Sequence, residues 1–312
     1  MESQGMIMKD LRDGTDSYVD LRPRPTRQTD WCVRSFRVLL GARVLIQAML
    51  TFIGLGLYDE DSITVEGREA LQNADRVYAE FYTSRLVGAE VADLEAAYGV
   101  DIEVRDREGV ERDPEPMLSA AADGDVAFLT AGDTMISTTH TDLRLRAADR
   151  GIDTRVIHGV TAQSAASSLT GLQNYRFGKA VTLPFPYAHG GDGVPDSVIK
   201  SIEANRERGL HTLVYLDIKV GTGPTGPDPD HEEYMTADYA AKLLAEGWTD
   251  ALGVVVARAG SPDPVVAADA LSALADREFG DPLHMLLIPG DLHHVEAEAL
   301  VGLAGAPDSI HE

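Results

Sequence analysis

Short apolar runs alternate with mixed apolar and polar stretches along most of the chain. In the first half, the apolar runs predict strands and the stretches between them predict helices. The predicted strands are residues 50–54, 76–80, 102–105, 125–130 and 153–157, and the predicted helices lie near 63–73, 88–98, 114–122 and 138–150. The run Val126–Leu129 is apolar throughout, which is typical of strands that helices cover on both faces. The alternation therefore predicts βαβ units and a parallel sheet.

The second half repeats this alternation after the small-residue segment Thr161–Leu169, which predicts a helix or a linker. The Gly/Pro/Asp-rich segment Gly221–Glu233 is expected to be an unpacked surface loop. Strands are predicted near 180–184, 211–217, 252–258 and 284–288, and helices near 196–208, 236–246, 265–277 and 292–303. The pattern thus predicts an α/β protein with two α/β domains, residues 49–160 and 161–312, and a ligand cleft between them.

The clearest local feature is residues 51–64, where an apolar strand runs into the turn Gly54-Leu-Gly56 and then into an acidic loop. Ser62, at the end of the loop, is predicted as the N-cap of the next helix. The two glycines would let the backbone approach a ligand closely, but the third glycine of a dinucleotide fingerprint is missing. The turn indicates either a site for another ligand or a tight strand-to-helix turn that binds nothing.

The net charge of the chain favours some classes of function and disfavours others. The formal net charge is -24, and only five of the 27 basic residues are lysine. Such a composition is typical of proteins that stay hydrated in concentrated salt, which indicates a halophile's cytoplasm; an ordinary acidic cytoplasmic enzyme is the alternative. Nucleic acid is disfavoured as a partner because phosphate binding needs clustered Lys and Arg. Cys32 is the single cysteine, and His293 and His294 cannot both face one metal ion, so no metal site is predicted.

Residues 1–48 differ from the remainder, with eight basic against six acidic side chains and little periodicity. One hypothesis is that Met49 is the true start and that the leader is upstream sequence translated in error. The other is a disordered basic tail. The apolar run Val38–Tyr58 is interrupted by Arg43 and Gln47, and a charge at mid-span costs about 2.5–3.5 kcal/mol, so no membrane span is predicted.

Ligands of open α/β sheets bind at the carboxyl ends of the strands, so the residues that follow each strand are candidates. Glu80–Ser84 indicates a pocket for a cationic substrate or a strand edge followed by a helix start. Asp133 indicates a ligand-binding carboxylate or a helix cap. The loop His158–Ser164 would bind a ligand through its amides or merely link the domains. His284 is an oriented pocket histidine or a buried structural one.

Taken together, these strand ends resemble those of the archaeal diphthine synthases, a family with the tetrapyrrole-methylase fold. The resemblance begins at Met49, which favours the start-site hypothesis, and it extends to about residue 310. The family usually has proline at Thr134 and Ser-Ile where this chain has Thr161-Ala162. The matching stretches are FIGLGLYDEDSIT (52–64), AEFYTS (79–84), AFLTAGD (127–133), TTHTDLRLRA (138–147), VIHG (156–159), GLHTLVYLDIK (209–219), VVARAGS (255–261), EFGDPLH (278–284) and VEAEALVGLAGAP (295–307).

The resemblance implies a cytoplasmic, homodimeric methyltransferase that uses S-adenosyl-L-methionine. Its substrate would be the 3-amino-3-carboxypropyl group on a histidine of translation elongation factor 2, whose amino group is trimethylated in diphthamide biosynthesis. No catalytic residue is implied, although Glu80 and Asp59 are candidates for stabilising the cationic product. By matching position, the cofactor would be held by Leu57, Asp133, Ile136, Thr161, Ala162, Leu216, Ala259 and His284.

Two other functions are compatible with the same fold. One is a methylase acting on a corrin ring or ribosomal RNA; the net charge argues against RNA, and the EFYTS and YLDIK stretches argue against corrins. The other is a non-catalytic sensor of an adenosyl ligand, which the intact strand-end residues of both halves disfavour.

Overall fold

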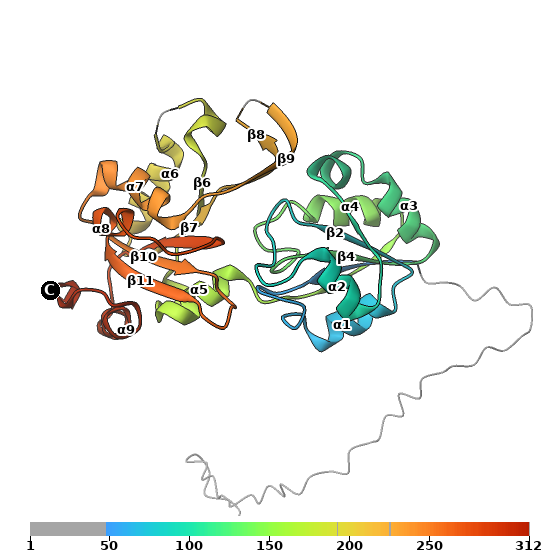
Figure 1. Ribbon diagram of the computed structural model, residues 1–312, viewed down its shortest axis with the longest axis horizontal. Helices are drawn as coiled ribbons and strands as arrows, with labels where there is room; N and C mark the ends of the chain where they lie inside the picture. Colours follow the sequence, from blue (N-terminus) through green and yellow to red (C-terminus); the bar gives the residue numbers. More distant parts are fainter. Residues whose placement is uncertain (1–47, 192, 225, 312) are drawn as a thin grey trace, which may run out of the picture. The chain divides into compact units, whose positions relative to one another are not determined.

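The computed structural model describes residues 48–191, 193–224 and 226–311. The hypotheses on the leader fall almost wholly outside this range and stay predictions. The described residues belong to one compact unit that holds two five-stranded sheets and a two-stranded hairpin (Figure 1). Within the described ranges, none of the helices has the length and apolar character needed to cross a membrane.

The first sheet is parallel throughout and runs in the order β3-β2-β4-β1-β5. Strand β4 pairs with β1 on one side and β2 on the other, which explains its uninterrupted apolar run. The predicted parallel sheet is confirmed, and the carboxyl ends of its strands share one edge. The strands are β1 (Met49–Gly54), β2 (Arg76–Glu80), β3 (Ile102–Val104), β4 (Asp125–Thr130) and β5 (Asp153–Ile157).

Helices cover both faces of this sheet and bury an apolar cluster on each. Leu71 of α1 and Leu94 of α2 pack on one face, and Leu118 of α3 and Leu143 of α4 pack on the other. The sheet is therefore fixed from both sides, with its carboxyl edge left for loops. The helices are α1 (Val65–Gln72), α2 (Val91–Tyr98), α3 (Glu115–Asp123) and α4 (Thr141–Asp149), and a π-helical turn, η1 (Glu108–Arg112), precedes α3.

The second sheet runs in the order β11-β10-β12-β7-β6 and is mixed, because only β6 and β7 are parallel. Its strands are β6 (Val181–Leu183), β7 (Thr212–Leu216), β10 (Leu252–Ala257), β11 (Val265–Ala270) and β12 (His284–Ile288). Helices α6, α7 and α8 pack on one face, and α5 and α9 pack on the other. These helices are α5 (Ala162–Thr170), α6 (Asp196–Arg206), α7 (Ala237–Trp248), α8 (Leu271–Ala275) and α9 (His294–Ala304); the 3-10 turns are η2 (Asn174–Arg176), η3 (Pro186–His189) and η4 (Asp308–His311).

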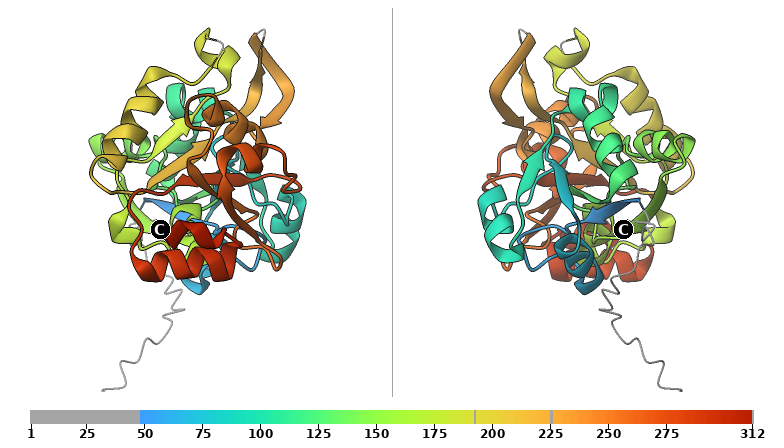
Figure 2. Two further views of the ribbon diagram at one scale, coloured as in Figure 1. Left: turned by 90° about the vertical axis from the view of Figure 1, so that its left-hand side faces the viewer. Right: turned by 90° about the vertical axis from the view of Figure 1, so that its right-hand side faces the viewer.

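The prediction that Gly221–Glu233 is an unpacked loop is wrong. This segment belongs to an antiparallel hairpin of β8 (Ile218–Gly223) and β9 (Gly226–Tyr234), with a bulge between Val220 and Thr222. The hairpin projects from the second sheet (Figure 2). A lone hairpin is marginally stable, but Val220 packs against the apolar cluster of α3 and α4, and Tyr234 lies under the Arg85 guanidinium. These distant contacts stabilise the hairpin, and local sequence does not show them.

Two further local predictions are wrong. Residues 265–277 were expected to form a helix, but 265–270 form the edge strand β11, and only the short α8 follows. The buried alanines of this strand suit a helix equally well, and pairing with β10 decides the outcome. Ser62 does not cap α1, since its Oγ accepts from the amides of Tyr58 and Asp59 at 3.2 Å each. Thr64 is the N-cap, accepting from Gly67 N at 3.0 Å.

Candidate functional site

Four glycines bring the strand-end loops of the first sheet into contact. Gly56 N donates to Gly132 O at 3.2 Å, and Gly132 N donates to Gly56 O at 2.6 Å, so the loop after β1 pairs with the loop after β4. A Cβ atom at Gly54 would lie 2.5 Å from both the Gly132 carbonyl oxygen and the Gly159 nitrogen. Only a residue without a Cβ permits this approach, so these glycines fix where three loops converge.

Asp133 is a buried carboxylate that ties two of these loops together, with 4% of its surface exposed. Its Oδ2 accepts from His158 Nδ1 at 2.7 Å and from Gly159 N at 3.3 Å, and its Oδ1 accepts from Met135 N at 2.9 Å. Helix α4 starts after His140, so Asp133 does not cap that helix. The carboxylate instead joins the loop after β4 to the loop after β5.

The second sheet also gathers its candidate residues at one edge. His284, the first residue of β12, pairs with Ala257, the last residue of β10, and β12 is antiparallel to β7, which ends at Leu216. Because β12 runs opposite to both neighbours, its start lies at the same edge as their ends. Leu216, Ala259 and His284 therefore belong to one edge of this sheet.

The imidazole of His284 is fully engaged by the protein. Its Nδ1 accepts from Ala237 N at 3.1 Å, so Nε2 carries the proton and donates to Asp281 O at 3.0 Å. Burial lowers the pKa of His284, which keeps the ring neutral. The structure thus favours the structural alternative for this side chain, and a ligand at this position would meet the backbone.

Contacts between the two edges complete the arrangement. A Cβ at Gly260, in the loop after β10, would lie 2.6 Å from Leu57 Cβ. Tyr215 OH receives a hydrogen bond from Ser137 Oγ at 2.8 Å and donates one to Gln163 Oε1 at 3.1 Å. These contacts involve Leu57 itself and the chain neighbours of four other predicted cofactor residues, which are Ile136, Ala162, Leu216 and Ala259.

Sequence reasoning did not single out Ser137, Tyr215 or Gln163. Ser137 adopts a positive φ of 59°, which neither its residue type nor the neighbouring sequence predicts. Thr161, the remaining predicted residue, is the N-cap of α5, and its hydroxyl accepts from Ser164 N at 3.3 Å. All eight predicted cofactor residues therefore lie on the converging loops or at the strand ends beside them.

The converging loops carry polar atoms that the protein leaves unused. Thr134 Oγ1 and Ser261 Oγ are buried, and neither has a hydrogen-bond partner within the described part of the chain. A Cβ at Gly132, whose φ is 77°, would meet no atom within 4 Å, so the space in front of this backbone is open. A buried hydroxyl without a partner costs free energy, which a polar ligand would offset. The donor set therefore fits a ligand with several polar groups.

Comparisons with known proteins agree with this arrangement. The family model described as Tetrapyrrole (Corrin/Porphyrin) Methylases matches residues 49–275. The diphthine synthase of Halorubrum lacusprofundi is 84% identical over 264 residues, covering 85% of this chain and 100% of that protein. The diphthine synthase of Natronomonas pharaonis is 74% identical over 261 residues, covering 84% of this chain and 98% of that protein. The chain belongs to the diphthine synthase family of tetrapyrrole methylases.

Solved structures support the same assignment. A crystal structure of diphthine synthase matches with a TM-score of 0.75 at 36% identity, covering 84% of this chain and 98% of that one. A putative diphthine synthase from Entamoeba histolytica matches with a TM-score of 0.71 at 34% identity, covering 83% of this chain and 100% of that one. The predicted family, the methyltransferase class and the pair of α/β domains are confirmed.

Asp59 and Glu80 are the two acidic candidates for stabilising the cationic product. In this member of the diphthine synthase family, both carboxyl groups accept hydrogen bonds from the protein itself. Asp59 Oδ1 accepts from Ser62 Oγ and Asp61 N, both at 3.1 Å, within the loop after β1. Glu80 has no exposed surface, and its Oε2 accepts from the amides of Tyr82 and Thr83 at 3.0 Å each. Glu80 is therefore an interior group beneath the strand ends.

Glu80 lies beside a second buried titratable group, His140, with Oε1 3.4 Å from His140 Nε2. Burial raises the pKa of Glu80 to about 7, although hydrogen bonds from Thr83 and Tyr82 oppose this. Burial also lowers the pKa of His140 to about 4. His140 Nδ1 donates to Thr134 O at 3.0 Å, which leaves Nε2 with its lone pair toward the carboxyl group. A neutral acid beside a neutral imidazole is the form that burial favours.

Glu80→Gln is expected to change how stability depends on pH. Because folding raises the pKa of Glu80, its contribution is complete below pH 4.5 and is lost as the pH rises toward 7. His140 acts in the opposite sense, and its contribution is lost as the pH falls from 6.5 toward 4. The glutamine variant should therefore gain stability relative to the wild type between pH 4.5 and 7, as measured by urea unfolding. Glu103→Gln, at an exposed site, is the control; parallel pH profiles for wild type and Glu80→Gln would contradict the assignment.

Proposed function

We propose that this chain transfers methyl groups from S-adenosyl-L-methionine to a modified histidine of translation elongation factor 2. The acceptor is the amino group of the 3-amino-3-carboxypropyl substituent, and three transfers give the trimethylammonium of diphthine. The observation that carries the proposal is the 84% identity to the diphthine synthase of Halorubrum lacusprofundi over that protein's full length. The convergence of both sheet edges on one set of loops supports it.

The residues of the converging loops suit the cofactor. Leu57 and Gly260 would contribute apolar surface and backbone, while the unused hydroxyls of Thr134 and Ser261 would meet polar groups of the ligand. Asp133 would hold the loops after β4 and β5 in the binding geometry. When bound, S-adenosyl-L-methionine supplies an electrophilic methyl group on a sulfonium.

The contribution of the chain to methyl transfer is chiefly positioning. Orienting two reactants can supply as much as ~7–11 kcal/mol of the barrier reduction, and the acceptor amine must be neutral when it attacks. The nitrogen is protonated at the start of each round, so it must lose one proton before each of the three attacks, and the trimethylammonium product carries none. His158 is suited to take up each proton, because Nδ1 is held by Asp133 at 2.7 Å while its side chain is 74% exposed. Nε2, which has no hydrogen-bond partner among the described residues, is then the proton acceptor.

The test is a methyl-transfer assay in concentrated salt with the full chain. Cofactor labelled in its methyl group is incubated with elongation factor 2 that carries the 3-amino-3-carboxypropyl group. Label on the factor, with three methyl groups by mass spectrometry, is the expected result. Cofactor binding without transfer would instead support an adenosyl-ligand sensor, and label on ribosomal RNA or a corrin alone would support another methylase of this fold. The cytoplasmic location and the homodimer stay predictions.

A further inference from the structure

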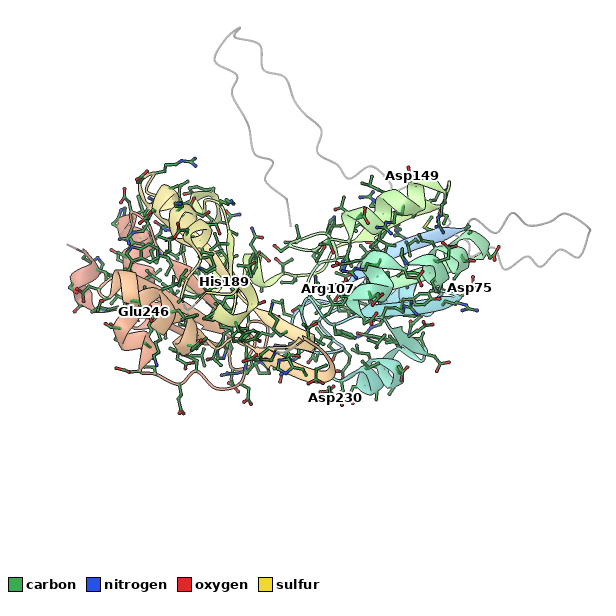
Figure 3. All side chains as sticks on the ribbon, turned by 90° about the horizontal axis from the view of Figure 1, so that it is seen from above. Asp75, Arg107, Asp149, His189, Asp230 and Glu246 are labelled. Carbon is green, nitrogen blue, oxygen red and sulfur yellow. The ribbon has the colours of Figure 1, made fainter. Side chains whose placement is uncertain are left out.

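A pocket of about 840 Å³ lies beside the converging loops and is lined by none of the eight predicted cofactor residues. One wall is formed by the residues that follow β2, another by β3, η1 and the residues between them, and the third by the hairpin β8–β9. In Figure 3, Arg107 marks the second wall and Asp230 marks the hairpin. The first wall is tied to the loop after β1, because Gly88 N donates to Tyr58 O at 2.8 Å. The third wall begins at Val220, four positions after Leu216.

The pocket is lined by charged side chains of both signs. Four are arginines, Arg85, Arg105, Arg107 and Arg112, and five are acidic, Glu90, Asp106, Glu108, Glu111 and Glu232. Arg105 is paired with Glu103 at 3.0 Å, and Arg107 is paired with Glu111 at 3.2 Å. For Arg85 and Arg112, the described residues provide no carboxylate within ion-pair distance. Two guanidinium groups in this pocket are thus available to an anion.

Arg85 is the better placed of these two. Its guanidinium carbon lies 4.4 Å from the centre of the Tyr234 ring, which holds the side chain between the first sheet's loop and the hairpin. Its Nε is buried and lacks a hydrogen-bond partner within the described ranges. Burying a guanidinium donor without an acceptor costs free energy, so the site is suited to a ligand that supplies one.

The substrate of the proposed function carries the matching group. Its 3-amino-3-carboxypropyl substituent has a carboxylate on the same carbon as the amine that is methylated. A guanidinium binds a carboxylate through paired, charge-assisted hydrogen bonds that fix its orientation. Holding the carboxylate would thereby orient the neighbouring amine.

We propose that this pocket receives the modified histidine side chain and that Arg85 binds its carboxylate. The inference rests on the proposed function and extends it to how the substrate is recognised. Arg85 is a binding residue in this scheme, and no bond is made or broken at it.

The test compares two synthetic peptides that carry the modified histidine, one with the free carboxylate and one with the carboxamide. Wild-type protein should bind and methylate the carboxylate peptide about 10- to 100-fold better, the range expected for a charge-assisted hydrogen bond. Arg85→Gln should lose this preference by weakening only the carboxylate peptide. Arg85→Lys, which keeps the charge, should restore part of it.

Two controls make the outcome specific. Arg206→Gln, at an exposed site on α6, should leave the preference intact, and calorimetry should give Arg85→Gln the wild-type affinity for S-adenosyl-L-methionine. A preference retained in Arg85→Gln overturns the pocket assignment and leaves the proposed function standing. An equal loss for both peptides also overturns it, because Arg85 would then bind an acidic residue of the peptide. If wild type transfers no methyl group, the proposed function fails, and peptide binding by calorimetry still decides the role of Arg85.

Discussion

Asp133→Ala is expected to weaken the binding of S-adenosyl-L-methionine by roughly 10- to 100-fold and to reduce methyl transfer accordingly. The carboxylate accepts from His158 Nδ1, Gly159 N and Met135 N, so its removal frees both loops and leaves these donors unsatisfied. A hydrogen bond to a charged group contributes about 1.5–3 kcal/mol, which corresponds to this range of affinity. Calorimetric titration of the purified variant with the cofactor measures the effect.

Two variants serve as controls for Asp133→Ala, one conservative and one remote from the site. Asp133→Asn keeps the size of the side chain and should lose less affinity than alanine. Asp142→Ala removes an exposed carboxylate that forms an ion pair with Arg146 on α4, and it should bind the cofactor as the wild type does. Unchanged cofactor affinity in Asp133→Ala would remove Asp133 from the site.

Glu296→Ala is expected to lower the free energy of unfolding by about 3–5 kcal/mol, because it leaves buried polar partners uncompensated. Glu296 is fully buried and accepts hydrogen bonds from Arg176 Nη1 at 2.7 Å and His211 Nε2 at 3.0 Å. The amides of Gln173 and His293 donate to it at 2.9 and 2.8 Å. The carboxylate therefore joins the start of α9 to η2 and to the residue before β7. Urea unfolding in concentrated salt measures the loss.

Glu298→Ala is the matched control, since Glu298 is exposed on the same helix and should change stability little. The pH dependence adds a second check. Burial opposes ionisation of Glu296, but the hydrogen bonds from Gln173, His293 and His211 outweigh it and lower the pKa below 4.5. Its contribution is therefore present above pH 4.5 and is lost on further acidification. An alanine variant as stable as the wild type at pH 7 would show that the network contributes nothing.

Much of the first domain was predictable because its signals are local and consistent. The run Val126–Leu129 is buried on both faces of a central parallel strand, and such runs need no further context. The loop residue Asp133 was identified by its place after that strand. Arg85 was not, because its importance depends on Tyr234, about 150 residues later, and on an unpaired Nε.

The second domain was less predictable because its strands are mostly antiparallel and several of its residues suit more than one state. Val265–Ala270 contains three alanines, which favour a helix, yet backbone pairing with β10 makes it a strand. His284 was placed correctly at a strand start, but the sequence does not tell that this start shares an edge with the ends of β7 and β10. The antiparallel pairing of β12 with β7 and β10 places the start of β12 at that edge, and composition does not predict this pairing.

The position of β4 in the first sheet has a consequence for synthesis. Both β1 and β2 use β4 as a neighbour, with Met49 opposite Asp125 and Arg76 opposite Val126. On the ribosome, these two strands must therefore wait, unpaired with each other, until β4 emerges. The loop that carries Asp133 follows β4 directly. The strand that joins β1 to β2 and the loop proposed to hold the cofactor therefore emerge from the ribosome together. The partners of Asp133, His158 and Gly159, emerge later, after β5, so the core of this sheet can pair before its ligand site is complete.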